Sequence, residues 1–138
     1  MGKIVLIDSG PIVAALRERD QHHAWARSHF DSIVNPCLTC EAVVSESFFL
    51  LEGAPRGKET LCGLLERGII VAAFQWVNHR SEVLRLIRRY SDTPMSFADA
   101  CLVRMAEIHD QGVVFTTDTD FQAYRMNGRQ TIPTIAPW

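Results

Sequence analysis

The sequence lacks any run of apolar residues long enough to span a membrane, which takes about 20 consecutive residues. Its start, from Met1 to Ile4, leads directly into a strand pattern without the charged and apolar segments of a signal peptide. Leu6 stands where a myristoylation signal has a hydroxyl residue. We therefore expect no membrane association and a cytoplasmic location.

An excess of charge of either sign is also missing. There are 14 Lys and Arg residues against 16 Asp and Glu residues, so the formal net charge is −2. This balance excludes the strong overall positive field that draws nucleic acid to many of its binding proteins. Any contact with nucleic acid must therefore come from a local group of basic residues.

Cysteine is scarce, with four residues at positions 37, 40, 62 and 101. Cys37 and Cys40 form a C-x-x-C pair, a pattern that occurs in redox sites and in one half of a zinc site. A structural zinc site needs a second pair of ligands, and no close pair of Cys or His residues supplies it. We interpret the cysteines as small apolar residues near a strand end, in the reduced state of an intracellular protein.

The composition is that of an ordinary globular domain. The chain has 138 residues, of which 47% are hydrophobic and 22% charged, enough to build one core. Internal repeats, low-complexity segments and linkers are absent from the sequence. We therefore expect a single domain over residues 1–138.

Apolar runs that favour strands alternate with amphipathic stretches that favour helices. The strands are predicted at residues 3–8, 36–39, 69–74, 112–116 and 131–135. The helices are predicted from Gly10-Pro11, from Asp20 to about Phe30, at 41–52, 57–67, 77–90 and 96–110, and briefly after Asp120. This alternation predicts an α/β fold, a three-layer α/β/α sandwich with a mainly parallel central sheet.

Four carboxylates stand in apolar surroundings. Asp8 and Asp118 each follow an apolar run that is predicted to be a strand, whereas Glu46 and Asp99 lie within predicted helices. The helical neighbours of Glu46 at i±3 and i±4 are Ala42, Val43, Phe49 and Leu50. A carboxylate on a surface that faces the core is costly unless something compensates its charge. Because the carboxyl ends of parallel strands meet at one edge, the four are placed compatibly with one site, where a divalent metal would offset their repulsion.

Each acid also has a purely structural explanation. Asp8 would cap the following helix, and Asp99 would form a capping box with Ser96. The segment from Thr116 to Asp120 would be a polar turn that starts a helix. No cap or turn explains Glu46, although a buried arginine partner would. Taken together, these explanations require four independent coincidences, so we favour a shared site.

Four segments resemble, in order and spacing, the PIN-domain family and its VapC-type ribonuclease toxins. The segments are Val5–Pro11, Leu38–Glu46, Ala98–Ala100 and Thr116–Phe121. The resemblance implies an endoribonuclease that depends on Mg²⁺ or Mn²⁺ and hydrolyses RNA phosphodiester bonds. It also implies a role as the toxin of a toxin–antitoxin pair.

The resemblance also assigns roles to individual residues. The family's first three acids correspond to Asp8, Glu46 and Asp99, and the fourth corresponds to Asp118, which Asp120 would replace or assist as a metal ligand. Thr116 and Ser9 correspond to hydroxyl residues that orient the acids. Some relatives carry a further acid before Asp99. This chain has Ser96 and Phe97 there, which leaves the number of metal ions open.

Basic and aromatic residues are weaker candidates for contacts with RNA. Arg85, Arg88 and Arg89 share one helical face, and Arg125 and Arg129 lie near the last acidic segment. They would bind phosphates, or simply form a solvated face. We interpret Trp25, Trp76 and Trp138 as packing residues in preference to platforms on which bases stack.

Alternative functions and partners remain open at this stage. RNA is the implied substrate, and an antitoxin protein and a homodimer are further partners that the resemblance allows. A non-catalytic RNA- or protein-binding module with the same fold is the main alternative, although the presence of all four acids argues against it. Phosphotransfer of the haloacid-dehalogenase type needs a second Asp two residues after the first, where this chain has Gly10.

Overall fold

A parallel sheet of five strands forms the centre of the molecule. The structure, a computed structural model, describes residues 2–33 and 36–138. The strands are β1 (Ile4–Ile7), β2 (Cys37–Thr39), β3 (Ile70–Ala72), β4 (Gly112–Phe115) and β7 (Thr134–Ile135). Their order in the sheet is β3-β2-β1-β4-β7, and every neighbouring pair is parallel.

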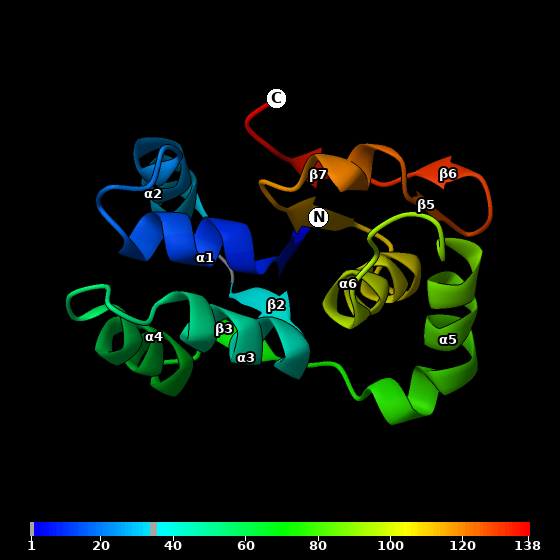
Figure 1. Cartoon of the computed structure of the whole chain (residues 1–138), viewed down its shortest axis with the longest axis horizontal. Helices are drawn as coiled ribbons and strands as arrows, with labels where there is room; N and C mark the ends of the chain where they lie inside the picture. Colours follow the sequence, from blue (N-terminus) through cyan, green and yellow to red (C-terminus); the bar gives the residue numbers. More distant parts are fainter. Residues whose placement is uncertain (1, 34–35) are drawn as a thin grey trace.

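In the described part of the chain, six α-helices cover the two faces of the sheet. They are α1 (Ser9–Leu16), α2 (His23–Ser32), α3 (Glu41–Leu50), α4 (Gly57–Glu66), α5 (Arg80–Arg89) and α6 (Phe97–Ile108). Figure 1 shows α1 to α4 on one side of the sheet and α5 with α6 on the other. The three-layer α/β/α sandwich predicted from the sequence is therefore confirmed.

The order of the strands places a switch in topology between β1 and β4. The chain proceeds from β1 outward through β2 to β3, and then returns to form β4 on the other side of β1. In open sheets of this kind, ligands bind outside the carboxyl ends of the strands at such a switch point. The residues that follow Ile7 and Phe115 are therefore the first place to look for a site.

The two central strands are held in register by a fully buried core. Leu6 and Ile7 pair with Val114 and Phe115, and all four side chains are buried. The ring of Phe115 also packs against those of Trp25 and Phe30, at centroid distances of 5.3 and 5.5 Å. Because Ile7 is level with Phe115, the next residue of each strand emerges at the same height, and the Asp8 amide donates to the Phe115 carbonyl at 2.9 Å.

Several predicted boundaries differ from the structure. The second helix begins at His23, and Asp20 does not cap it, because the Asp20 carboxylate accepts from the His22 amide in the preceding turn. The third strand is shorter than 69–74, since Phe74 leaves the sheet and stacks on His79. A 3-10 turn, η1 (Trp76–His79), precedes α5, so the α-helix begins only at Arg80.

The C-terminal region contains a hairpin that the single predicted strand at 131–135 did not include. Strands β5 (Arg125–Met126) and β6 (Gln130–Thr131) are antiparallel and form a second, two-stranded sheet. Asn127 and Gly128 turn the chain with φ angles of 51° and 87°, the left-handed conformation that hairpin turns require. The chain then continues past Pro133 into β7.

Two expectations about composition can be compared with the structure. Within residues 2–33 and 36–138, none of the helices has both the length and the apolar character that crossing a membrane requires. The cysteines are free thiols, and Cys37, Cys40 and Cys101 are buried in the core, in agreement with their interpretation as packing residues.

Candidate active site

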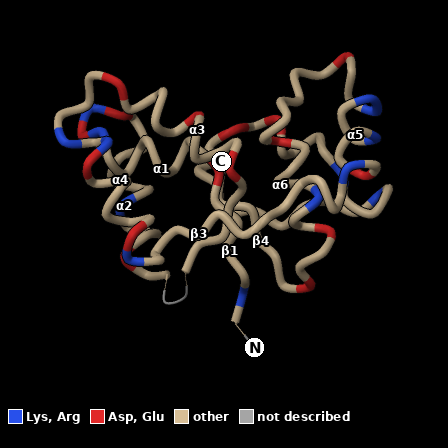
Figure 2. The backbone as a smooth tube through the Cα atoms, turned by 90° about the horizontal axis from the view of Figure 1, so that it is seen from below, with Lys and Arg blue, Asp and Glu red and all other residues tan. Residues whose placement is uncertain are grey.

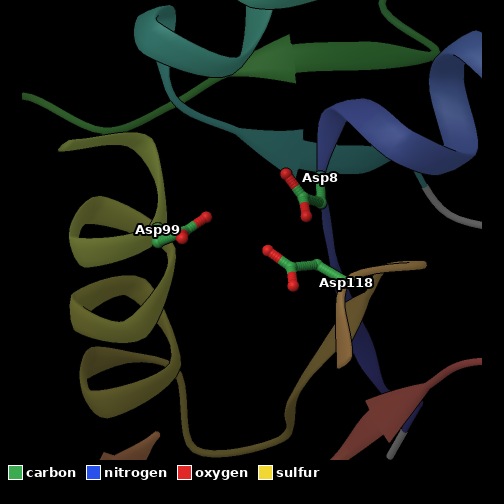
Figure 3. Close-up of side chains that lie close together, drawn as sticks. All are labelled: Asp8, Asp99 and Asp118. Carbon is green, nitrogen blue, oxygen red and sulfur yellow. The ribbon is translucent and has the colours of Figure 1, made fainter. Parts of the chain in front are cut away.

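Three aspartates converge at the switch point between β1 and β4. Asp8 directly follows β1, Asp118 is the third residue after β4, and Asp99 lies in the first turn of α6. One carboxylate oxygen from each lies within 4.8 Å of the others, and Figure 3 shows the three side chains pointing into a common space. Among the described residues, this is the group of acids, histidines and cysteines whose atoms lie close enough together to hold a metal ion.

Asp8 is the most enclosed of the three, with 6% of its surface exposed. Its Oδ1 accepts a hydrogen bond from the Ser9 amide at 2.8 Å, and its Oδ2 accepts one from the Thr116 hydroxyl at 2.7 Å. Burial raises the pKa of Asp8 to about 7; the charges of Asp99 and Glu46 add to this, and the two hydrogen bonds oppose it. Asp8 is also the N-cap of α1, so the structural role and a place in the site coexist.

Asp99 is fixed by three hydrogen bonds at the start of α6. The predicted capping box is present, because the Asp99 amide donates to the Ser96 hydroxyl at 3.0 Å and the Ser96 amide donates to Asp99 Oδ2 at 3.2 Å. The phenol of Tyr124 donates to the same Oδ2 at 3.0 Å. Burial is the main reason why the pKa of Asp99 is raised. With Oδ2 engaged by the protein, Oδ1 is the oxygen that remains for a ligand.

Asp118 is partly buried and caps the short 3-10 helix η2 (Thr119–Gln122). Its amide donates to the Thr116 hydroxyl at 2.9 Å, and its Oδ1 accepts from the Asp120 amide at 2.9 Å. Asp120 lies in the first turn of η2, as the sequence predicts, and is not one of the three converging acids. Partial desolvation and the neighbouring Asp118 charge raise the pKa of Asp120.

Glu46 does not face the core, contrary to the sequence-based expectation. It is exposed, because two of the apolar neighbours on its helix are themselves exposed, Phe49 at 77% and Leu50 at 41%. Its Oε1 accepts a hydrogen bond from the Ser9 hydroxyl at 2.8 Å, and its charge contributes to the raised pKa of Asp8. Glu46 therefore borders the site without belonging to the group of three.

Two hydroxyl residues connect the acids. Thr116 accepts from the Asp118 amide and donates to Asp8, while Ser9 donates through its amide to Asp8 and through its hydroxyl to Glu46. Both hydroxyls are therefore hydrogen-bonded to an acid, and their role in orienting the acids remains a prediction. Next to Ser9, Gly10 approaches the loop after β4 so closely that an added Cβ would lie 2.1 Å from Thr117 Oγ1.

The five arginines proposed to bind phosphate are not part of this group. Arg85, Arg88 and Arg89 are exposed on α5, and Figure 2 shows the basic residues of α5 at one end of the molecule, apart from the central acids. Arg125 donates to the Gln122 and Tyr124 carbonyls, and Arg129 is exposed in the β5–β6 turn. Their binding of RNA remains a prediction.

Tyr124 is a site residue that the sequence-based reasoning missed. Its side chain is fully buried, packs edge-on against Tyr90 and Phe121 at centroid distances of 5.1 Å, and donates to Asp99. Burial and the nearby acids raise the pKa of Tyr124 well above its usual value. Its position three residues after Phe121, behind the last acidic segment, is the only signal in the sequence.

Comparison with known proteins agrees with this geometry. A model of the PIN domain family matches residues 5–126. Among solved structures, the chain is similar to VapC20 of Mycobacterium tuberculosis, a toxin that cleaves the Sarcin-Ricin loop; the TM-score is 0.76, the identity 17%, and 86% of this chain and 93% of that chain are covered. No curated protein sequence matches significantly. The structural likeness extends to the fold, and the family match, which covers most of the sequence, shows that this chain belongs to the PIN-domain family.

Proposed function

We propose that this protein is a metal-dependent endoribonuclease that hydrolyses phosphodiester bonds in RNA. The observation that carries the proposal is the convergence of Asp8, Asp99 and Asp118 at the switch point of a PIN-family sheet. Two buried acids and a third that is partly buried oppose folding unless a cation or a proton compensates their charge. A site that concentrates this charge at the edge where ligands bind has the arrangement that metal-assisted phosphodiester hydrolysis needs.

The three aspartates fit a small divalent cation. Carboxylate oxygens are the ligands that Mg²⁺ and Mn²⁺ prefer, and one oxygen from each residue lies within 4.8 Å of the others. Asp8, Asp99 and Asp118 would hold the ion, with Glu46 and Asp120 beside it. When bound, such an ion supplies positive charge at the phosphate and lowers the pKa of water nearby.

The chain's own side chains would position these groups. Thr116 and Ser9 hold both oxygens of Asp8, and Ser96 with Tyr124 holds Oδ2 of Asp99. Glu46 is exposed and its Oε1 accepts from the Ser9 hydroxyl, so its carboxylate would accept a proton from water at the rim of the site. Orientation through several hydrogen bonds limits the reorganisation that binding of the cation and the RNA would require.

The biological setting is a further part of the proposal. The likeness in fold to VapC20, which is a toxin, supports a role as the toxin of a toxin–antitoxin pair that acts on cytoplasmic RNA. An antitoxin protein and a second copy of the chain are the partners that this role would bring. The complete set of acids argues against a module that only binds RNA or protein.

Cleavage of a mixed RNA pool tests the proposal directly. The pool would be incubated with the wild-type protein in Mg²⁺, in Mn²⁺ and in EDTA, and in parallel with Asp8→Asn. Asp110→Asn is the matched control, since Asp110 is an exposed acid at the opposite, amino end of β4. We expect cleavage with either metal for wild type and Asp110→Asn, and none in EDTA or with Asp8→Asn. Equal cleavage by Asp8→Asn and wild type would refute the assignment.

A further inference from the structure

An aromatic pocket lies beside the three aspartates. It has a volume of about 390 Å³ and is lined by Phe74, Trp76 and Phe97 together with Cys40, Glu41, Ala42 and Cys101. These residues come from the segment between β3 and α5, from the start of α3 and from the start of α6. In Figure 1 the chain that leads from β3 to α5 passes the beginning of α3. We use the name aromatic pocket for this hollow below.

Two of the three aromatic rings are open to solvent. Trp76 is 38% exposed and Phe97 is 40% exposed, whereas Phe74 is buried. The rings of Trp76 and Phe97 meet edge to face, with centroids 5.4 Å apart and planes at 83°. The interpretation of Trp76 as a packing residue is therefore incomplete, because it packs against Phe97 but keeps much of its surface free. A perpendicular pair of this kind leaves ring surface on which a third planar group can stack.

The aromatic pocket adjoins the acids on two sides. Phe97 is the first residue of α6, two positions before Asp99. On the other side, the Thr39 hydroxyl donates to the Ile7 carbonyl at 2.7 Å, which fixes Cys40 and the start of α3 next to Asp8. A group bound in the pocket would therefore be adjacent to a phosphate held at the aspartates.

The chemistry of the pocket indicates its occupant. Among the residues that the structure describes, no Lys or Arg lines it, which does not favour a phosphate. Exposed aromatic rings, by contrast, stack on bases of any sequence. The exposed Glu41 carboxylate is an acceptor for the exocyclic amino group of a base such as cytosine. We propose that the aromatic pocket binds one unpaired nucleobase of the RNA strand, preferentially one with an amino group, next to the scissile phosphate. This inference rests on the proposed nuclease function.

Binding without cleavage provides the test. All variants would be made in the Asp8→Asn background, and their affinity for fluorescent single-stranded oligonucleotides of cytidine, uridine and abasic units would be measured by anisotropy. Loss of stacking on one base corresponds to about 5- to 100-fold weaker binding, so we expect Trp76→Ala to show this loss with cytidine oligonucleotides. The abasic oligonucleotide should bind with equal affinity to Asp8→Asn and to the double variant that also carries Trp76→Ala.

Three further variants complete the experiment. Trp76→Phe keeps a ring and should restore most of the affinity, which a variant that merely failed to fold would not do. Trp138→Ala removes another exposed tryptophan, outside the pocket, and should leave affinity unchanged. Glu41→Gln, which does not disturb the core, should reduce the preference for cytidine over uridine.

Failure of the base site and failure of the proposed function are distinguishable. Unchanged cytidine affinity in Trp76→Ala, or an equal loss with the abasic oligonucleotide, would overturn the base site while leaving the cleavage result intact. The base site would also be overturned if Trp76→Ala kept its affinity for RNA but no longer bound a protein that the wild type binds. The aromatic pocket would then be assigned to that protein. Absence of RNA cleavage by the wild-type protein with either metal would remove the proposed function itself.

Discussion

Helices α3 and α6 both carry an acid toward the same strand ends, but they hold it in different ways. Most of α6 is buried, and Asp99 is fixed by the capping box and by Tyr124. On α3 only Val43 and Ser47 are buried, and Glu46 is exposed with one hydrogen bond from Ser9. The pKa of the buried Asp99 is raised, chiefly because burial desolvates its carboxylate. Holding this carboxylate in its charged form therefore opposes folding, and the rigid surroundings of Asp99 offset that cost. The comparison teaches that the acids around one site need not contribute in the same way.

The largest expected difference between the acids of α6 and α3 is in the rate of RNA cleavage, when each acid is replaced by its amide. Asp99→Asn removes one of the three converging carboxylates, and we expect it to lower the rate of RNA cleavage by about 1,000-fold or more. Glu46→Gln removes the carboxylate proposed to accept a proton at the rim, and should lower the rate by about 100-fold, the lower end of the range for general-base catalysis. Single-turnover cleavage at saturating Mn²⁺ measures both. Equal losses of cleavage rate in the two variants would mean that Asp99 and Glu46 contribute equally to catalysis.

Stability against pH should show the second largest effect. The pKa of Asp8 is about 7 in the folded protein and near 3.8 in the unfolded chain. Between these values the unfolded chain releases a proton that the folded protein keeps, so the free energy of unfolding decreases as pH rises and levels off above 7. The metal-free protein should therefore lose on the order of a few kcal/mol between pH 4 and pH 7. Urea unfolding in EDTA across this range measures the slope.

Two variants test whether Asp8 causes this dependence of the free energy of unfolding on pH. Asp8→Asn should flatten most of it, because the amide does not titrate, whereas Glu46→Gln should change it only slightly. Saturating Mn²⁺ should stabilise the wild-type protein increasingly as pH rises, since the cation binds the ionised carboxylates. A metal-free protein that becomes more stable from pH 4 to pH 7 would contradict the arrangement described for Asp8.

Metal affinity should distinguish Asp118 from Asp120. Only Asp118 converges with Asp8 and Asp99, so Asp118→Asn should weaken Mn²⁺ binding by at least about 10- to 100-fold. Asp120→Asn should weaken it much less, because Asp120 acts from the first turn of η2. Calorimetric titration of both variants measures the difference. If Asp120→Asn is the more damaging change, the ligand assignment moves to Asp120 and the nuclease proposal survives.

Removal of the Tyr124 hydroxyl should have the smallest effect of this series. Tyr124→Phe takes one donor from Asp99 Oδ2 and leaves the Ser96 amide in place, so we expect a loss of about 1 kcal/mol in the free energy of unfolding. A moderate loss of Mn²⁺ affinity should accompany it, since Asp99 becomes less well oriented. Thermal unfolding and metal titration of the variant test this, with Tyr90→Phe as the control from the same aromatic cluster. Wild-type metal affinity in Tyr124→Phe would make the contact structural only.

The parts of the site that depend on local pattern were predictable from the sequence. Asp8 and Asp118 follow apolar strands, and parallel strands bring their carboxyl ends to one edge, so their meeting follows from the alternation of elements alone. The capping box of Ser96 and Asp99 has a recognisable spacing. At each of these residues, the local structure is determined by the few residues that precede and follow it in the sequence.

The parts that depend on long-range packing were not predictable. Apolar neighbours of Glu46 suggested burial, but a helix can present Phe49 and Leu50 to solvent, and the periodicity does not say which face the core covers. Tyr124 reaches Asp99 only because the loop after β4 folds over α6. The hairpin around Asn127-Gly128 was missed because its strands have two residues each, too few for an alternating pattern.

The close approach of Gly10 to Thr117 holds the chain that follows β1 against the loop that follows β4. Backbone, with no Cβ on one side, meets a β-branched residue whose Oγ1, Cβ and Cγ2 would all lie within 3.5 Å of an added methyl group. A residue larger than glycine would act as a wedge, moving Asp118 away from Asp8 without altering any acid. The same contact sterically excludes an aspartate at position 10, where phosphotransfer enzymes of the haloacid-dehalogenase type carry their second acid. In this molecule, therefore, one hydrogen atom in place of a side chain lets the turn after β1 and the loop after β4 pack against each other, and so sets how closely Asp8 and Asp118 approach.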